Sequence, residues 1–214
     1  MQAIYSDEHR FMDGGYGVKY ETAAIHPSLL VTFSPWRGAR AHARIMESLP
    51  NSVPIGVLLR DRDGGEVRVG KDGNPVVKYR LSDYDVGHVR RGVEGAAGIL
   101  EAAGAQRIFS SHSRLAAYEP GRNGGRADFM RAADSCGWNT GRCTYGSFHI
   151  MGSARMGGSP ESSACNPRGE TWEVRNLFVC DGSAFPTASG VNPMISIEAI
   201  AHMNASALAA TLTR

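Results

Sequence analysis

Two stretches near the end of the sequence have residue types and spacing that suit a charged ligand. Residues 176–180 (NLFVC) form an apolar run that predicts a buried strand, and this run stops at the turn Asp181-Gly182-Ser183. Further on, Asn192-Pro193 opens a helix expected over residues 194–212, because proline is favoured near the first helical position. A strand, a turn and a helix start in this order favour an anionic or dipolar ligand at the helix N-terminus.

A histidine upstream is the other candidate for chemistry. His149 lies in FHIMGSARMG (148–157), where an extended segment over 147–151 is expected to run into a Gly-flanked loop. Taken singly, such a histidine is more often structural, Asn192 is more often a helix N-cap and Asp181 a turn former. Spacing alone therefore does not identify an enzyme.

Several well-defined catalytic and binding motifs are absent from the sequence. It contains no H-E-x-x-H, no G-x-S-x-G, no phosphate-binding P-loop and no G-x-G-x-x-G. The four cysteines form no C-x-x-C pair and no metal spacing, so we predict free thiols and no metal site. A dinucleotide function would lack its usual glycine-rich pyrophosphate loop.

Composition excludes several classes of protein. The net charge of +2, from 23 basic and 21 acidic residues, gives no electrostatic case for binding nucleic acid. No apolar run reaches the roughly 18 residues that span a bilayer, so no transmembrane segment is expected. Residues 1–10 are polar and lack the apolar core of a secretory signal, which predicts a cytoplasmic protein and leaves peripheral membrane association open.

The first 80 residues are expected to be mainly β. A short strand from Val18 should lead into an irregular segment up to about Leu30, where His26-Pro27 blocks a helix. Residues 36–48 predict a helix. Three strands over 53–59, 66–69 and 76–79, joined by Gly-containing turns, predict an antiparallel meander.

Helices dominate the expected structure of the middle of the chain. Ser82 should cap a long helix that ends at Gly104, with Asp83 and Asp85 in its first turn. Residues 106–110 predict a short strand, and residues 127–136 predict a second helix.

Taken together and in this order, the motifs resemble the C-terminal signature of the glucose–methanol–choline (GMC) oxidoreductases. The resemblance rests on residues 148–157 (FHIMGSARMG), 176–187 (NLFVCDGSAFPT) and 190–199 (GVNPMISIEA). Residues 166–174 (NPRGETWEV) narrow it to the long-chain (fatty) alcohol oxidase branch. A sterol oxidase or another alcohol oxidoreductase of the same family stays open as an alternative.

The resemblance implies oxidation of a primary, long-chain alcohol by FAD. His149 matches the family's active-site histidine, which would accept the hydroxyl proton, and Asn192 matches the position that holds the substrate oxygen. The cofactor would be held by five residues, Asp181, Gly182, Asn192, Pro193 and Met194. Glycine suits position 182 because a Cβ would obstruct the approach of the backbone to the FAD diphosphate.

The implied fold is α+β, within a full-length family that is α/β overall. Residues 1–175 would form the substrate-binding domain, an antiparallel sheet with helices. Residues 176–214 would supply the last strand and helix of a Rossmann-like FAD-binding domain whose N-terminal part is absent.

The absent half could reside on another chain, or this chain could be an inactive remnant or an interaction module. A truncated chain should expose the apolar residues of its final helix, Ile195, Ile197, Ile200, Met203 and Leu208.

Overall fold

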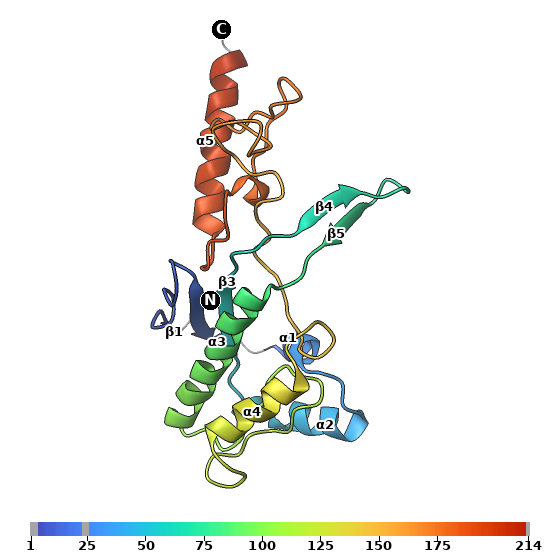
Figure 1. The fold of residues 1–214 in the computed structure, drawn as a ribbon, viewed down its shortest axis with the longest axis vertical. Helices are drawn as coiled ribbons and strands as arrows, with labels where there is room; N and C mark the ends of the chain where they lie inside the picture. The colour runs from blue at the N-terminus through green and yellow to red at the C-terminus, as the bar shows by residue number, and fades with distance from the viewer. Residues whose placement is uncertain (1–3, 23–25, 213–214) are drawn as a thin grey trace. The chain divides into compact units, whose positions relative to one another are not determined.

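The chain contains both helices and antiparallel strands, which occur in groups along the sequence and confirm the predicted mixed fold class (Figure 1). The computed structural model describes residues 4–22 and 26–212. It divides into two units: unit 1 comprises 1–60 and 81–146, and unit 2 comprises 61–80 and 147–214. No helix among the described residues is both long and apolar enough to cross a membrane.

The sheet of unit 1 has three antiparallel strands, in the order β1 (Tyr5–Ser6), β2 (Gly17–Thr22) and β3 (Ile55–Arg60). The prediction of a meander is wrong, because β3 pairs along its whole length with β2 and not with the strand that follows it. The physical reason is burial. Strand β3 is half-buried throughout and lies against a helix, whereas the next strand, Glu66–Val69, is exposed at every residue.

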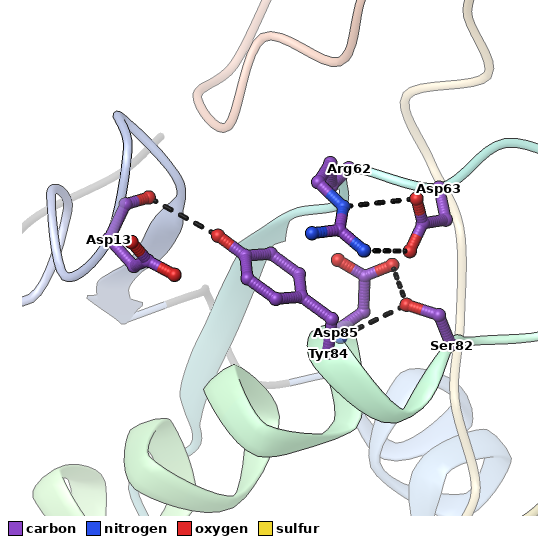
Figure 2. A network of polar contacts seen from close by, with 6 residues as sticks. All are labelled: Asp13, Arg62, Asp63, Ser82, Tyr84 and Asp85. Carbon is purple, nitrogen blue, oxygen red and sulfur yellow. Dashed lines mark hydrogen bonds and ion pairs between the residues drawn. The ribbon is translucent and has the colours of Figure 1, made fainter.

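Helix α3 (Asp83–Ala102) covers this sheet, and both of its predicted ends are confirmed. Figure 2 shows its start, where Ser82 Oγ accepts from the Asp85 amide at 3.2 Å and donates to the Asp85 carboxylate at 2.8 Å. At its end, Gly104 has φ +83°, and the Ala105 amide donates to the Leu100 carbonyl. This geometry is a Schellman motif, which satisfies carbonyls of the last turn.

Two glycines of α3 give a direct test of this helix–sheet packing. A Cβ on Gly92 would lie 2.5 Å from Val57 Cγ1 and 3.0 Å from Val18 Cγ2, whereas nothing lies within 4 Å of a Cβ on Gly87. We expect Gly92→Ala to lower the free energy of unfolding by about 1–3 kcal/mol through overpacking. Gly87→Ala should raise it by up to about 1 kcal/mol through helix propensity. Urea unfolding followed by circular dichroism measures both, and equal effects would contradict the packing.

The second predicted helix of unit 1 is confirmed as α4 (Arg126–Cys136). It buries Phe129, Met130 and Ala133 in a cluster with apolar residues from α3 and from the surrounding loops. The predicted strand over 106–110 is wrong: only Ile108 makes a β-bridge, with Tyr118. A single rung forms because the partner segment is itself a loop.

Helix α2 (Ala39–Ser48), followed by the one-turn η1 (Leu49–Asn51), matches the predicted helix. The expectation that His26-Pro27 blocks a helix is wrong, because α1 (Pro27–Phe33) begins at that proline. Proline is tolerated at the first helical position, where its missing N–H would have no helical partner. The predicted irregular segment includes residues 23–25, which lie outside the described residues.

Unit 2 begins with a hairpin of β4 (Glu66–Val69) and β5 (Pro75–Lys78), as the turn sequence predicted. The Gly70 amide donates to the Asn74 carbonyl at 2.7 Å across the turn. Where the chain enters this unit, Arg62 and Asp63 form a two-bond ion pair, also drawn in Figure 2. The eight strand residues are all exposed, so this ribbon is not packed within the described structure.

The rest of unit 2 is a long series of loops, the short η2 (Gly182–Ala184) and the helix α5 (Met194–Leu212), which matches the predicted final helix. The predicted buried strand over 176–180 is wrong. Phe178 makes one β-bridge, with Glu170, and Leu177 is 50 % exposed. The reason is that the backbone of this apolar run pairs with the loop around residues 169–171 and with no strand among the described residues.

Candidate active site

The turn at Asp181 is built by the aspartate itself. Asp181 caps η2, and its carboxylate accepts hydrogen bonds from the backbone amide of Ser183, at 2.8 Å, and from the Ser183 hydroxyl. Because these bonds favour the ionised form, they hold the pKa of Asp181 below its usual value, the hydroxyl being the larger cause. The turn therefore presents an exposed, ionised carboxylate at neutral pH.

Ser183 gives a prediction about this carboxylate. Ser183→Ala removes the hydroxyl donor, so the pKa of Asp181 should rise towards that of an ordinary aspartate. The pKa of Asp181 is lower in the folded state than in the unfolded state. Its ionised carboxylate therefore stabilises the fold above the unfolded-state pKa, and this contribution is lost as the pH falls through the folded-state pKa. In Ser183→Ala the folded-state and unfolded-state pKa values of Asp181 should lie closer together, so the ionised carboxylate should contribute less to stability. Carboxyl NMR titration measures the shift, with Ser206→Ala on α5 as the control that leaves the titration unchanged.

The segment that follows His149 runs along this turn. The Ala154 amide donates to the Ser183 carbonyl at 3.0 Å, and the Met156 amide donates to the Ala184 carbonyl at 2.9 Å. Further back, the carbonyl of Ile150 lies 3.1 Å from the position of a Cβ on Gly182. His149 is therefore one residue from a backbone contact with the turn. Its ring is half-buried and makes no hydrogen bond among the described residues.

Helix α5 begins beside the same glycine. The Pro193 carbonyl accepts the first helical bond, from the Ile197 amide at 2.8 Å, so Pro193 stands at the N-cap and Asn192 precedes it. The single-residue expectation of Asn192 as the N-cap is wrong by one position. The first helical bond comes after the amides of Met194, Ile195 and Ser196. Backbone amides at this end of a helix have no partner within the helix.

The three segments predicted to carry the site meet at Gly182. A Cβ there would approach both the Ile150 carbonyl and Ile197 Cδ1, the latter at 3.3 Å. Gly182 is itself buried, whereas Asn192 and Met194 are exposed and Pro193 is buried. The structure thus gives Gly182 a packing reason for having no side chain, alongside the ligand reason expected from the sequence.

Sequence reasoning missed two residues that hold this arrangement. Asn204, in the middle of α5, is fully buried, and Gly169 is buried against it with φ +83°. The feature of the sequence that could have identified Asn204 is its amide side chain within an otherwise apolar helical stretch.

The final helix leaves part of its apolar surface in solvent. Ile195 is 69 % and Met203 46 % exposed, which confirms the prediction for these two residues. The prediction is wrong for Ile197, Ile200 and Leu208, which are half-buried because they lie on the face that also carries Asn204. Exposed apolar residues on a helix of this length indicate a surface that packs elsewhere.

Three further features of the described residues concern possible chemistry: a pocket, the cysteines and the metal-ligating side chains. An open pocket of about 460 Å³ in unit 1 is lined by seven residues, none of them predicted for the site: His9, Met12, Arg91, Glu94, Gly95, Gly98 and Arg126. All four cysteines are free. No cluster of metal-ligating side chains occurs within residues 4–22 and 26–212.

The family model described as GMC oxidoreductase matches residues 61–201 of this chain. Among curated proteins, long-chain-alcohol oxidase FAO4A of Arabidopsis thaliana is 37 % identical over 185 residues, which are 85 % of this chain and 25 % of that protein. Long-chain-alcohol oxidase FAO3 of the same plant is 30 % identical over 203 residues, 90 % of this chain and 26 % of the relative. The chain therefore spans about a quarter of the length of these relatives.

A solved structure agrees at the level of the fold. A variant of formate oxidase from Aspergillus oryzae RIB40 superposes with a TM-score of 0.59 at 16 % identity. The match covers 92 % of this chain and 32 % of the formate oxidase chain.

Proposed function

Because this chain belongs to the GMC oxidoreductase family, we propose that it is the C-terminal part of an FAD-dependent enzyme that oxidises a primary, long-chain alcohol to the aldehyde. The observation that carries the proposal is the meeting at Gly182 of the segments bearing His149, Asp181 and Asn192. The choice of a long-chain alcohol is supported by relatives of 30–37 % identity, which are named for that substrate.

In this proposal His149 is the base. Removal of a hydride from an alcohol requires that the hydroxyl proton also leave, and imidazole is suited to accept a proton near neutral pH. The ring of His149 has no hydrogen-bond partner among the described residues, so its nitrogens are available to a substrate hydroxyl. The Asn192 amide would hold the substrate oxygen, which fixes the orientation of the α-hydrogen.

The described residues fit a cofactor with a diphosphate and hydroxyl groups. The amides of Met194 and its two successors precede the first helical bond of α5 and lie at the positive end of its dipole, which favours an anion. The ionised Asp181 carboxylate can accept hydrogen bonds from hydroxyls. When bound, FAD would supply the two-electron redox chemistry, as the hydride acceptor.

The division of the chain between the two functions is part of the proposal. Residues 1–175 would bind the substrate, and residues 176–214 would complete an FAD-binding domain. The other half of that domain would come from the remainder of a longer polypeptide or from a second chain. Two observations support this division: the chain matches about a quarter of the length of its relative, and α5 has exposed apolar residues.

The test is an absorbance spectrum and an intact mass of the protein purified from its own host. Flavin absorbance that bleaches when a long-chain alcohol is added, from a polypeptide longer than 22.9 kDa or from a 22.9 kDa chain held with a partner, is the expected result. A lone 22.9 kDa chain without flavin would contradict the proposal. A sterol that bleaches the flavin faster than the linear alcohol would overturn the substrate assignment alone.

A further inference from the structure

Asn204 is the one residue that α5 buries fully among its described positions, although the helix is otherwise rich in Ile, Ala and Met. It lies on the covered face of the helix, with the half-buried Ile197, Ile200 and Leu208 at helical spacing. Burying an amide is costly unless it forms hydrogen bonds. The contacts of Asn204 therefore explain what this position does.

The amide of Asn204 ties α5 to two loops of the candidate site. Nδ2 donates to the Val179 carbonyl at 2.7 Å and lies 3.6 Å from Met156 Sδ. Val179 is two residues before Asp181, and the Met156 amide bonds the Ala184 carbonyl of the same turn. The amide thus joins the helix to the segment before the turn and to the segment after His149.

Gly169 makes room for this amide. A Cβ on Gly169 would lie 2.2 Å from Asn204 Nδ2, and the Gly169 carbonyl accepts from the Val179 amide at 2.8 Å. The backbone of Val179 is therefore held on one side by Gly169 and on the other by Asn204. The second polar atom of the side chain, Oδ1, is buried without a partner among the described residues. An unpaired buried acceptor lowers stability, so the amide is a poor choice for stability alone.

A directional bond in the middle of a helix fixes the helix start. Asn204 lies ten residues after Met194, which is about 15 Å along the axis. A slip of one residue would move the helix by about 1.5 Å and turn it by about 100°. Apolar contacts tolerate such a slip better than a hydrogen bond to a single carbonyl does.

We propose that Asn204 is a positioning residue, which sets the axial and rotational register of α5 and thereby places the first turn of this helix beside the turn at Gly182. This inference rests on the proposed function for its catalytic consequence, but not for its structural one. Asn204 acts through the backbone carbonyl of Val179 and through the Met156 side chain of the 150–156 segment.

The test compares Asn204→Leu with Leu208→Ala in the protein purified from its own host. Leucine keeps the branching and the number of side-chain heavy atoms of asparagine, although its methyl groups are larger, and it removes both the donor and the unpaired acceptor. The melting temperature should therefore fall less than in Leu208→Ala. We expect kcat per bound flavin to fall by about 10- to 100-fold, because misplacement by about 1 Å has effects of this size. Leu208→Ala should lower the melting temperature and leave kcat unchanged.

Hydrogen exchange provides a readout that needs no activity. The amides of Ala154, Met156 and Phe185, all bonded at the turn, should exchange roughly 10-fold faster in Asn204→Leu and not in Leu208→Ala. Unchanged exchange and kcat in Asn204→Leu, or equal losses in both variants, would overturn the inference. If Asn204→Leu does not fold, Asn204→Ala replaces it, and failure of both to fold would mean a purely structural role.

The two readouts separate the two proposals. If the wild-type flavin is not bleached by any alcohol, the proposed function fails, while faster exchange in Asn204→Leu would still support the positioning role.

Discussion

His149→Ala is expected to lower the rate at which a long-chain alcohol bleaches the flavin by about 10²- to 10⁴-fold, the usual contribution of a general base. Flavin content should stay at the wild-type level. The reason is that the His149 ring makes no hydrogen bond among the described residues, so its removal breaks no polar contact of the turn. Stopped-flow absorbance measures the rate of bleaching, and the absorbance spectrum of the protein before alcohol is added measures its flavin content.

His202→Ala is the matched control, since His202 is an exposed histidine on α5 in the same unit. It should bleach at the wild-type rate. Added imidazole should partly restore bleaching in His149→Ala, because a free base can enter the space that the ring vacates. Equal rates in His149→Ala and the wild type would remove His149 from the chemistry, whatever the flavin content.

Local signals in the sequence were sufficient for most helices and turns. Ser82 and Gly104 mark both ends of α3 because a cap hydrogen bond and a positive φ are properties of single residues and their near neighbours. The turn between β4 and β5 was predictable for the same reason. The pairing of β3 was not predictable. Its apolar run can pair with any neighbouring strand, and its pairing with β2 depends on burial under α3, which lies far along the chain.

The candidate site divides in the same way. Asp181 and Pro193 were predictable as turn and helix-start residues, since their effects on the backbone are local. Asn204 and Gly169 were not, because each matters only through the other, 35 positions away, and a lone amide in an apolar helix does not reveal its partner. For residues 176–180 the sequence predicts too much structure. An apolar run predicts a buried strand, but within the described residues this run forms a single β-bridge.

Gly182→Val is expected to weaken flavin retention by about 10-fold or more, and to lower the free energy of unfolding by about 1–3 kcal/mol through overpacking. A Cβ would stand 3.1 Å from the Ile150 carbonyl and 3.3 Å from Ile197 Cδ1, and the additional methyl groups of valine need still more space. The backbone beside His149 and the first turns of α5 would both have to move. Equilibrium dialysis and thermal unfolding measure the two effects.

Gly158→Val isolates the cause of that loss. Gly158 lies in the same unit with nothing within 4 Å of its Cβ position, so valine there adds the same atoms to open space. It should leave flavin retention and unfolding at wild-type values. If the two variants behave alike, the meeting of segments at Gly182 is not what holds the site. If only Gly182→Val loses flavin, the turn, the histidine segment and α5 depend on one another, and no single segment can be moved without the other two.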